Sequence, residues 1–417
     1  MRVPSTWHAF EMALSSLVAR LGLNLPITLR VYAAFFLYAL ALGGLYPHLA
    51  QIQQGMAVGE GALGFGLIGT ASGTLISLTF GGPWIERLGA RRVLLVGLPL
   101  VAVFYALASF APSPVWLFFS LLPAGICIGA VEQVVNLEAD RVEHALGRRI
   151  MNRSHAFWSM GFASAGLLGG LAAQSGLTPQ QHLCLMVAVL TLLTALALGK
   201  FSAAAHRPLS TSDVMAGHEA TASHEAIEAT PTAPRGAWPT WPIFVLVMAT
   251  LAPMLMEGAG IDWSAIYMRD VFGASPFICG IAVAAGATAQ AITRFFADQL
   301  VERFQPVRVA RSLMGVLALG VCMVTWALSP WMALVGLGLM GVGTSAIFPL
   351  AMSAAAQRTD RPAAVNVAAL AQTSFVIFLL GPPLLGWVAE YFGIRATFAV
   401  SLPLIALSFW AAKSLKS

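Results

Sequence analysis

Long apolar runs separated by short polar connections dominate the chain. An α-helix needs about 20 residues to cross a lipid bilayer. Runs of that length fall near residues 31–54, 62–85, 92–110, 114–138, 154–175, 183–201, 242–268, 276–300, 308–328, 331–355, 364–388 and 394–412. The pattern predicts an all-α membrane protein with twelve transmembrane helices in two pseudo-symmetric six-helix bundles.

The same pattern divides the chain into bundles and polar segments. The stretch between the two groups of runs is rich in Ala, Thr, Ser, His, Glu and Pro and lacks periodicity, so we expect a mobile linker. The first segment has apolar residues near helical spacing, which predicts an amphipathic surface helix or a partly ordered tail. The expected organisation is a cytoplasmic N-terminal segment (1–30), a first bundle (31–201), a cytoplasmic linker (202–240), a second bundle (241–413) and a cytoplasmic tail (414–417).

Composition supports the membrane setting, because hydrophobic residues make up 58% of the chain and charged residues only 10%. The net charge of +5 does not indicate a nucleic-acid partner, since the basic residues lie in short clusters between apolar runs. With both termini inside, all but three of the 23 Lys and Arg residues fall on the cytoplasmic side, the exceptions being Arg269, Arg294 and Arg395. This asymmetry predicts a multi-pass protein of the cytoplasmic (inner) membrane.

The two halves repeat one another. Glu86, Arg87 and Arg92 correspond to Glu302, Arg303 and Arg308 at an offset of 216 positions, and the same offset relates Gly125 to Gly341. Duplicated six-helix halves are typical of transporters whose substrate site lies at the interface of the halves, near the membrane midplane. We therefore expect alternating access.

One carboxylate lies inside an apolar, glycine-rich helix. Glu132 and Asn136 are four residues apart and share a helical face, while Gly125 and Gly129 have the same spacing and allow a neighbouring helix to approach closely. An ionisable residue at membrane depth is costly, which favours a role for Glu132 in substrate or proton binding. The alternative is a structural carboxylate that holds helices together.

Further polar residues at membrane depth are candidates for the same site. His155 and Trp158 share a face that can stack on a sugar ring, although His155 can also be a capped histidine at a helix end. Glu257 lies near mid-span, where Pro253, Gly258 and Gly260 are expected to interrupt the helix. Asp262 and Trp263 lie nearer the periplasmic end, and Asp262 either contributes to the site, pairs with Arg269 or caps a broken turn.

The remaining candidates lie in the eighth and eleventh runs. Arg294 and Asp298 are one turn apart, which favours an ion pair near the cytoplasmic end over anion binding. Asn366 and Gln372 offer the hydrogen-bonding groups of a polyol pocket, or else hold helices together. Because Arg294 is the one midplane cation, we expect a neutral or weakly polar solute.

Catalytic and metal-binding patterns are absent from the sequence. The four cysteines lie in different apolar runs without CxxC spacing, so neither a disulfide framework nor a zinc site is indicated. His206, His218 and His224 are irregularly spaced, which favours a solvated loop over a metal site. There is no Walker A loop, GxSxG or HExxH motif, and we expect neither an enzyme nor a resident cofactor.

The loop from Gly82 to Arg92, GPWIERLGARR, resembles the conserved cytoplasmic motif of the major facilitator superfamily, with Glu86 where Asp is commoner. The residues from Asp298 to Arg308 resemble its second copy. The resemblance covers nearly the whole chain and implies the fold of that superfamily. It also implies that a charge network at the cytoplasmic end steadies the outward-facing state, and the gating residues assigned on this basis are Gly82, Glu86, Arg87, Gly89, Arg91, Arg92, Arg141, Arg294, Asp298 and Arg303.

Shorter stretches carry narrower resemblances. The Glu-x-x-x-Asn of Glu132 and Asn136 resembles the fourth helix of fucose:proton symporters, in which the carboxylate is tied to sugar and proton handling. Residues 136–158 and 257–267 resemble the bacterial rhizopine-transport (mosC-like) proteins. Unlike the fucose symporters, this chain has no acid in its first run, which offers Tyr38, Tyr46 and His48 instead. Proton coupling would then use Glu132, Glu257, Asp262 or a histidine.

These observations predict a monomeric secondary transporter that moves a sugar or inositol-like polyol together with protons. The partners expected are this small solute, protons and the lipid bilayer. One alternative is proton-driven efflux of hydrophobic drugs or metabolites, for which a wide apolar cavity with one or two acids suffices. A second alternative is a membrane sensor that binds its ligand without transporting it.

Overall fold

The computed structural model describes residue 16 and residues 25–147, 150–204, 238–361 and 363–416. Its regular elements within these ranges are helices, and 12 of its helical spans are long and apolar enough to cross a membrane. The all-α class and the twelve spans predicted from the hydrophobic pattern are confirmed. The predicted N-terminal amphipathic helix and most of the predicted linker, with its three histidines, lie outside the described residues.

The first half contains six spans and a short helix in the loop after the second span. Its elements are α2 (Ile27–Gly43), η1 (Tyr46–His48), α3 (Leu49–Met56), α4 (Glu60–Phe80), α5 (Gly82–Leu88), α6 (Ala90–Ala108), α7 (Pro114–Leu146), α8 (Met151–Gln174) and α9 (Pro179–Leu198). Span one comprises α2, η1 and α3.

The second half follows the same order. Its elements are α12 (Trp241–Asp262), α13 (Ser264–Phe272), α14 (Pro276–Phe304), α15 (Pro306–Thr325), α16 (Pro330–Thr344), α17 (Ile347–Ala356), α18 (Ala363–Phe392), α19 (Ile394–Ala399), α20 (Ser401–Ala411) and η2 (Ala412–Leu415). The interruption expected within the seventh span at Gly258 and Gly260 is wrong, because α12 runs unbroken past both glycines and ends at Asp262.

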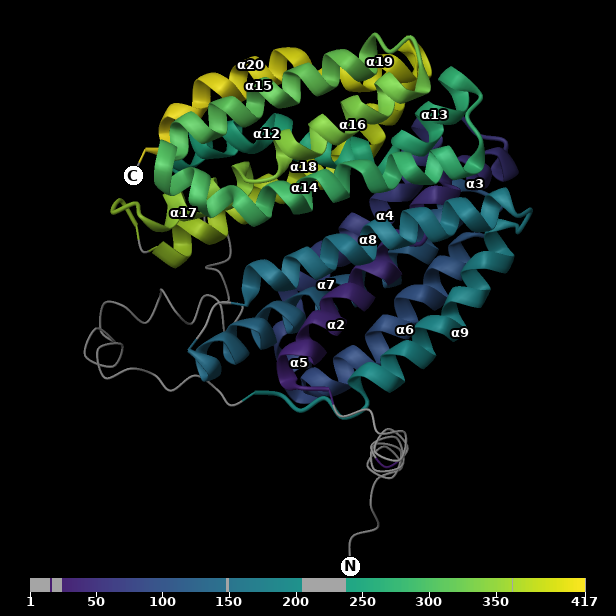
Figure 1. Cartoon of the computed structure of the whole chain (residues 1–417), viewed down its shortest axis with the longest axis horizontal. Coiled ribbons are helices and arrows are strands. Elements are labelled where there is room, and N and C mark those ends of the chain that lie inside the picture. Colours follow the sequence, from purple (N-terminus) through teal and green to yellow (C-terminus); the bar gives the residue numbers. More distant parts are fainter. Residues whose placement is uncertain (1–15, 17–24, 148–149, 205–237, 362, 417) are drawn as a thin grey trace, which may run out of the picture.

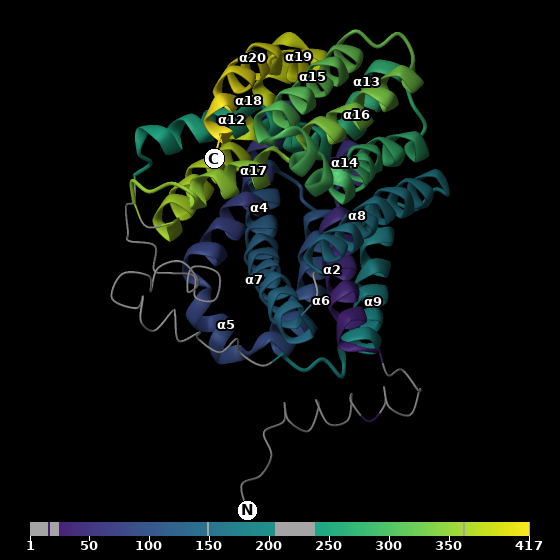
Figure 2. The same cartoon turned by 60° about the vertical axis from the view of Figure 1, so that its left-hand side comes forward.

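The two halves lie side by side and touch chiefly through two helix pairs, α8 with α14 and α4 with α18 (Figure 1). One end of the molecule carries α3 and α13, which pack on each other across the halves. The opposite end carries α5 and α17, and there the halves diverge (Figures 1 and 2). We call these the closed end and the open end.

The offset of 216 positions recurs in the structure. Ser113 caps α7 by accepting a hydrogen bond from the Trp116 N–H (3.3 Å), and Ser329 caps α16 by accepting one from the Met332 N–H (3.2 Å). A Cβ on Gly125 would overlap the Thr70 carbonyl, and a Cβ on Gly341 would overlap the carbonyl of Gly286, its equivalent. Close helix packing at both glycines is therefore part of the duplicated scaffold.

Contacts at the closed end are also duplicated. Gly64 of α4 packs on the backbone of Pro382 of α18, and its equivalent Gly280 of α14 packs on the backbone of Gly166 of α8. Within the described residues, the hydrogen bonds between the halves all lie at this end. They run from the Gly61 N–H to Glu390 Oε2 (2.9 Å), from Arg269 Nη2 to Gln53 Oε1 (2.9 Å) and from Arg269 Nη1 to the Ala50 carbonyl (2.5 Å).

Candidate functional site

A pocket lies between the two halves, with about 450 Å³ of empty space that includes space open to solvent. The first half contributes an aromatic face from α8, and the second half contributes α12, α14 and α16. The lining residues are Trp158, Phe162, Met256, Glu257, Gly260, Ile261, Ala282, Val283, Gly286, Ala287, Gln290, Leu337, Met340, Gly341 and Thr344. The cavity is thus mostly apolar, with three polar side chains grouped on one wall.

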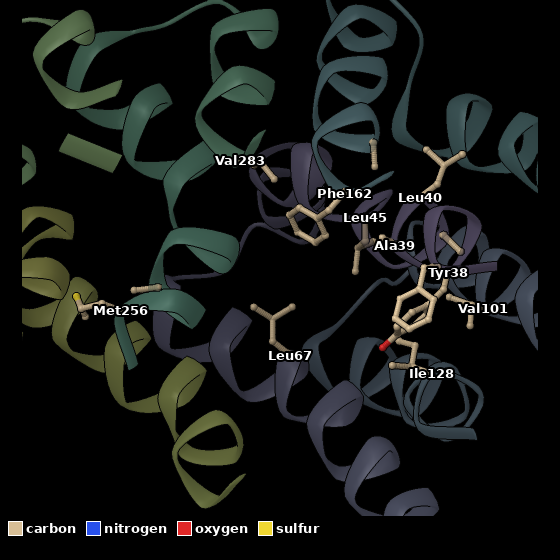
Figure 3. Close-up of a cluster of buried hydrophobic side chains, with 14 of the residues drawn as sticks. Tyr38, Ala39, Leu40, Leu45, Leu67, Val101, Ile128, Phe162, Met256 and Val283 are labelled. Carbon is tan, nitrogen blue, oxygen red and sulfur yellow. The ribbon is translucent and has the colours of Figure 1, made fainter. Parts of the chain in front are cut away.

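Aromatic rings form the wall from the first half. Trp158 and Phe162, one turn apart on α8, stack with ring centroids 5.6 Å apart, and Tyr46 lies 5.8 Å from Phe162. Tyr38 of α2 lies 6.5 Å from Trp158. Figure 3 shows Phe162 and Tyr38 on this side, with Met256 on the other. The predicted ring-stacking face at Trp158 therefore borders the cavity.

The opposite wall carries Glu257, Gln290 and Thr344. Gln290 Nε2 donates to Glu257 Oε1 (2.9 Å) and lies 3.4 Å from Thr344 Oγ1. Arg294 Nη2 lies 3.8 Å from the same Glu257 oxygen, and Arg294 Nε donates to the Ser345 carbonyl. Glu257 Oε2 makes no hydrogen bond within the described part of the chain, which leaves it available to a solute.

Gln290 and Thr344 are cavity residues that the sequence pattern did not predict. A signal for Gln290 was present, because it is an amide in an apolar span one turn from Arg294. The predicted Arg294–Asp298 pair stays a prediction, since the Asp298 side chain lies outside the described part.

Glu132 lies within the first half, behind the aromatic wall and outside the cavity lining. Its Oε2 accepts a hydrogen bond from the Tyr38 hydroxyl at 3.4 Å. Asn136 donates to the backbone carbonyl of Glu132 (2.8 Å), so the two side chains share a face without bonding to each other. Tyr38 thereby connects Glu132 with Trp158 at the cavity.

Asp262 and Trp263 mark the break between α12 and α13. Asp262 lines a second, smaller pocket with Gly258, Phe378 and Pro382. It does not pair with Arg269, which forms an ion pair with Asp270 instead. Trp263 is fully buried, packs against Gly386 at the closed end and does not line the central cavity.

The other binding candidates lie elsewhere. The His155 ring packs edge-on against Phe35, 5.2 Å away, within the first half. Asn366 donates to Asp360 Oδ1 at 2.9 Å in the turn before α18. Hydrogen bonds from Asn366 and Thr240 hold the pKa of the Asp360 carboxyl below its usual value. Gln372 is exposed on α18.

The motif residues of the first half lie at the open end. Glu86 and Arg87 are exposed, and the Arg87 guanidinium lies 5.7 Å from the Trp84 ring. Within the described chain, neither residue forms an ion pair. Gly82 begins α5, Gly89 separates α5 from α6, and Arg92 lies in the first turn of α6. The neighbouring Arg91 donates a hydrogen bond to the Gly199 carbonyl. The equivalent Arg303 lies 5.2 Å from the Phe304 ring.

Arg141 is buried on α7 beside Glu138. Its Nη1 lies 2.9 Å from Glu138 Oε1, and Glu138 Oε2 accepts a hydrogen bond from the Ala204 N–H at 2.9 Å. This pair anchors the chain that follows α9 to the end of α7. In the described residues, no group of three or more His, Cys, Asp and Glu side chains is placed to hold a metal ion.

The family model of the Major Facilitator Superfamily matches residues 31–263 and 245–415, which is nearly the whole chain. The chain belongs to the Major Facilitator Superfamily. It is therefore a multi-pass membrane transporter.

Individual relatives agree with this assignment. The chain is 29% identical over 371 residues to the uncharacterized transporter y4wD of Sinorhizobium fredii, covering 89% of this chain and 93% of the relative. It is 23% identical over 375 residues to the membrane protein MosC of Rhizobium meliloti, covering 89% and 86%. A solved structure of a mutant of the nucleoside transporter NupG superposes with a TM-score of 0.71 at 12% identity, covering 94% of this chain and all of NupG.

Proposed function

We propose that this superfamily member is a secondary transporter that moves a small polar solute, a sugar or inositol-like polyol, by alternating access. The observation that carries the proposal is the composition of the interface cavity. Trp158 and Phe162 provide an apolar face for a ring, and Glu257, Gln290 and Thr344 opposite them provide hydrogen-bonding groups. A solute held between the two walls contacts both halves and so responds to their relative movement.

The polar wall can recognise the hydroxyl groups of a solute. Glu257 Oε2 can accept a hydrogen bond from a solute hydroxyl, and the Arg294 guanidinium beside it can donate to a neighbouring oxygen. Because the two charges compensate each other, a neutral solute enters without leaving an unpaired charge behind. An anionic or cationic solute would have to displace one partner of this pair.

We assign the open end to the cytoplasm. It carries Arg87 and Arg303 and the basic residues beside them, whereas the closed end carries Arg269 and Arg395. The side richer in Lys and Arg is the cytoplasmic side of bacterial inner-membrane proteins. On this assignment the structure is the inward-facing conformation of a monomeric carrier, with both termini in the cytoplasm.

Glu132 and Glu257 are our candidates for proton coupling. Each lies at membrane depth in a different half, where a carboxylate that gains or loses a proton changes the charge of the interior. Tyr38 joins Glu132 to the aromatic wall, and Gln290 joins Glu257 to Thr344. Solute binding and protonation therefore act on connected side chains.

Export of hydrophobic compounds is the second candidate function. It is favoured by the apolar majority of the cavity lining, including Met256, Val283 and Met340. Polyol uptake requires that Glu257 recognise a solute hydroxyl, whereas export of hydrophobic compounds does not.

The test is a thermal-shift screen of the purified protein against sugars, inositols, nucleosides and lipophilic cations, followed by flux in proteoliposomes. A bound solute stabilises the folded protein by mass action, by about 2.7 kcal/mol at 100 times Kd. We expect a polyol hit that Trp158→Leu and Gln290→Leu abolish and that Gln372→Leu, an exposed position outside the cavity, retains. Hits confined to lipophilic cations would replace uptake with export, and binding without flux under any gradient would identify a sensor.

A further inference from the structure

Two buried histidines face each other at the closed end of the first half. His48 of η1 is fully buried and His182 of α9 is 5% exposed. His48 Nε2 lies 2.8 Å from His182 Nδ1, and His48 Nδ1 lies 3.0 Å from Gln51 Oε1. The central cavity and its polar wall do not include them.

The hydrogen bonds define where a further proton would bind. Gln51 Oε1 is an acceptor, so His48 Nδ1 carries a proton and donates it. His48 Nε2 is then the acceptor for the His182 Nδ1–H. His182 Nε2 makes no hydrogen bond within the described residues, and it is the ring nitrogen that can take one more proton. The added charge would be shared by two imidazoles.

The second half shows that the scaffold does not require this pair. The positions equivalent to His48 and His182 are Ser264 and Phe398. Phe398 is fully buried there and packs against Tyr267 with ring centroids 5.3 Å apart. An aromatic ring therefore takes the place of one imidazole, and Ser264 in the place of the other cannot bind a proton in the physiological pH range. The fold is thus packed at this place without a titratable pair, and the histidines need a reason other than packing.

The closed conformation opposes a charge on the pair. Both rings are buried, and His182 lies in the first turns of α9, where the helix dipole disfavours a cation. The titratable and charged groups on the surrounding elements are Tyr46 on η1, Tyr105 on α6, Cys279 on α14, Asp262 on α12, and Arg269 and Asp270 on α13. Within the described chain, no carboxylate contacts either imidazole.

Opening the closed end would expose this site. The element that carries His48, η1, packs on α8, α13 and α14, two of which belong to the other half. Separation of the halves removes the α13 and α14 side of this packing and admits water. We propose that His48 and His182 form a proton-binding site that fills when the closed end opens and must empty before it closes.

This inference rests on the alternate opening of the two ends in the proposed function. It predicts that acid on the closed-end side favours the conformation open there. One linked proton changes the ratio of open to closed molecules by up to about tenfold per pH unit. The shift should fall at about pH 6.5, where a hydrated imidazole takes up a proton.

The experiment measures distances between spin labels at Gln54→Cys and Ser275→Cys, both exposed at the closed end, in protein whose four native cysteines are replaced. The protein is placed in nanodiscs and titrated between about pH 5 and about pH 8, across the usual histidine range. The open population should grow on acidification. The double variant His48→Ser with His182→Phe reproduces the chemistry of the second half and should lose this dependence, and His182→Gln serves if the double variant does not fold.

Two further variants separate the histidines from other titrating groups. His144→Gln, an exposed histidine near the open end, should leave the pH response unchanged. Glu390→Gln removes a carboxylate that accepts a hydrogen bond across the closed end, and the response should survive it. A response that persists without the histidines, or is lost with Glu390→Gln, overturns the inference alone. A closed end that never opens in any condition overturns the inference and alternating access together.

Discussion

The two six-helix halves share a scaffold and differ in their polar interiors. Serine caps, close glycine contacts and the break near the end of spans one and seven recur at the same offset in both halves. The midplane acids do not recur. Glu132 of α7 corresponds to Phe348, and Glu257 of α12 corresponds to Ala41. The repeat thus maintains packing, while each half places its functional groups independently.

Two turns recur in both halves with nearly the same backbone angles. In one turn the first half has the glycine, and in the other turn the second half has it. Gly89 has φ 78° and ψ 149°, and its equivalent Gln305 has nearly the same angles, φ 70° and ψ 147°. At the end of α13, Gly273 has φ 58°, and its equivalent Ala57 at the end of α3 has φ 52°. Each half therefore holds one side chain in the left-handed region where the other has glycine, which indicates that the duplicated fold imposes these backbone angles.

The largest expected effect on transport comes from replacing Glu132 or Glu257, the acids that have no acidic equivalent in the other half. Glu132→Gln and Glu257→Gln should each lower gradient-driven uptake about 5- to 150-fold, the usual range of a coupling free energy. Exchange of solute without a gradient should continue, because neither change removes the aromatic wall. Proteoliposome flux with and without a pH gradient measures both quantities. Uptake that still follows the gradient in both variants would contradict proton coupling through these acids.

The glycine contacts test whether the shared scaffold is equally sensitive in both halves. Gly125→Ala and Gly341→Ala each place a Cβ against a backbone carbonyl and should destabilise the protein by about 1–3 kcal/mol. Gly338→Ala on the same α16 is the control, since a Cβ there meets nothing within 4 Å. Thermal unfolding in detergent provides the measurement. If Gly341→Ala unfolds no earlier than Gly338→Ala, close contact with the Gly286 carbonyl does not limit the residue at this position.

The reciprocal turns predict stabilisation in opposite halves. A side chain at these angles carries strain of about 1–3 kcal/mol, and glycine relieves it at some cost in unfolded-chain entropy. Gln305→Gly and Ala57→Gly should therefore each raise stability by about 1 kcal/mol. The reverse changes, Gly89→Gln and Gly273→Ala, should lower it. The pairs to compare are Gln305→Gly with Gly89→Gln, and Ala57→Gly with Gly273→Ala. If both variants of a pair raise the unfolding midpoint, or both lower it, backbone strain at these positions is excluded.

The smallest effect concerns the charged turns at the open end. On the superfamily resemblance, Arg87 steadies the conformation in which this end is closed, so Arg87→Ala should increase the population of the conformation described above. Exposed ion pairs contribute about 0–1 kcal/mol, which limits the shift to a few-fold. The spin-label pair at Gln54 and Ser275 measures it. Arg303→Ala tests the second copy, and an unaltered distribution in both variants would count against a gating role.

Much of the fold could be read from the sequence because it depends on local properties. Apolar run lengths predict the spans, and the repeat of Glu86–Arg87 at Glu302–Arg303 predicts the two halves. The end of α12 was misjudged because Pro253, Gly258 and Gly260 are tolerated when neighbouring helices support the backbone. Helix breaks depend on this support as much as on the residues themselves.

The candidate site was only partly predictable. Trp158 and Glu257 were singled out because aromatic and acidic residues at membrane depth are unusual. Their position on opposite walls of one cavity depends on how α8 packs against α14, which no periodicity encodes. Asn366 had the same kind of signal as Gln290, an amide in an apolar span, yet Asn366 binds a turn carboxylate and Gln290 lines the cavity.

Hydrophobic run length, charge asymmetry and an internal repeat were sufficient to establish a twelve-span membrane protein built from two similar halves, because these features arise within single helices or from duplication. Tertiary structure decided which polar side chains meet: Gln290 with Glu257, Tyr38 with Glu132, and His48 with His182, 134 positions apart. Such meetings depend on the crossing and depth of packed helices, and a helix shifted by a single turn, about 5.4 Å, would separate them.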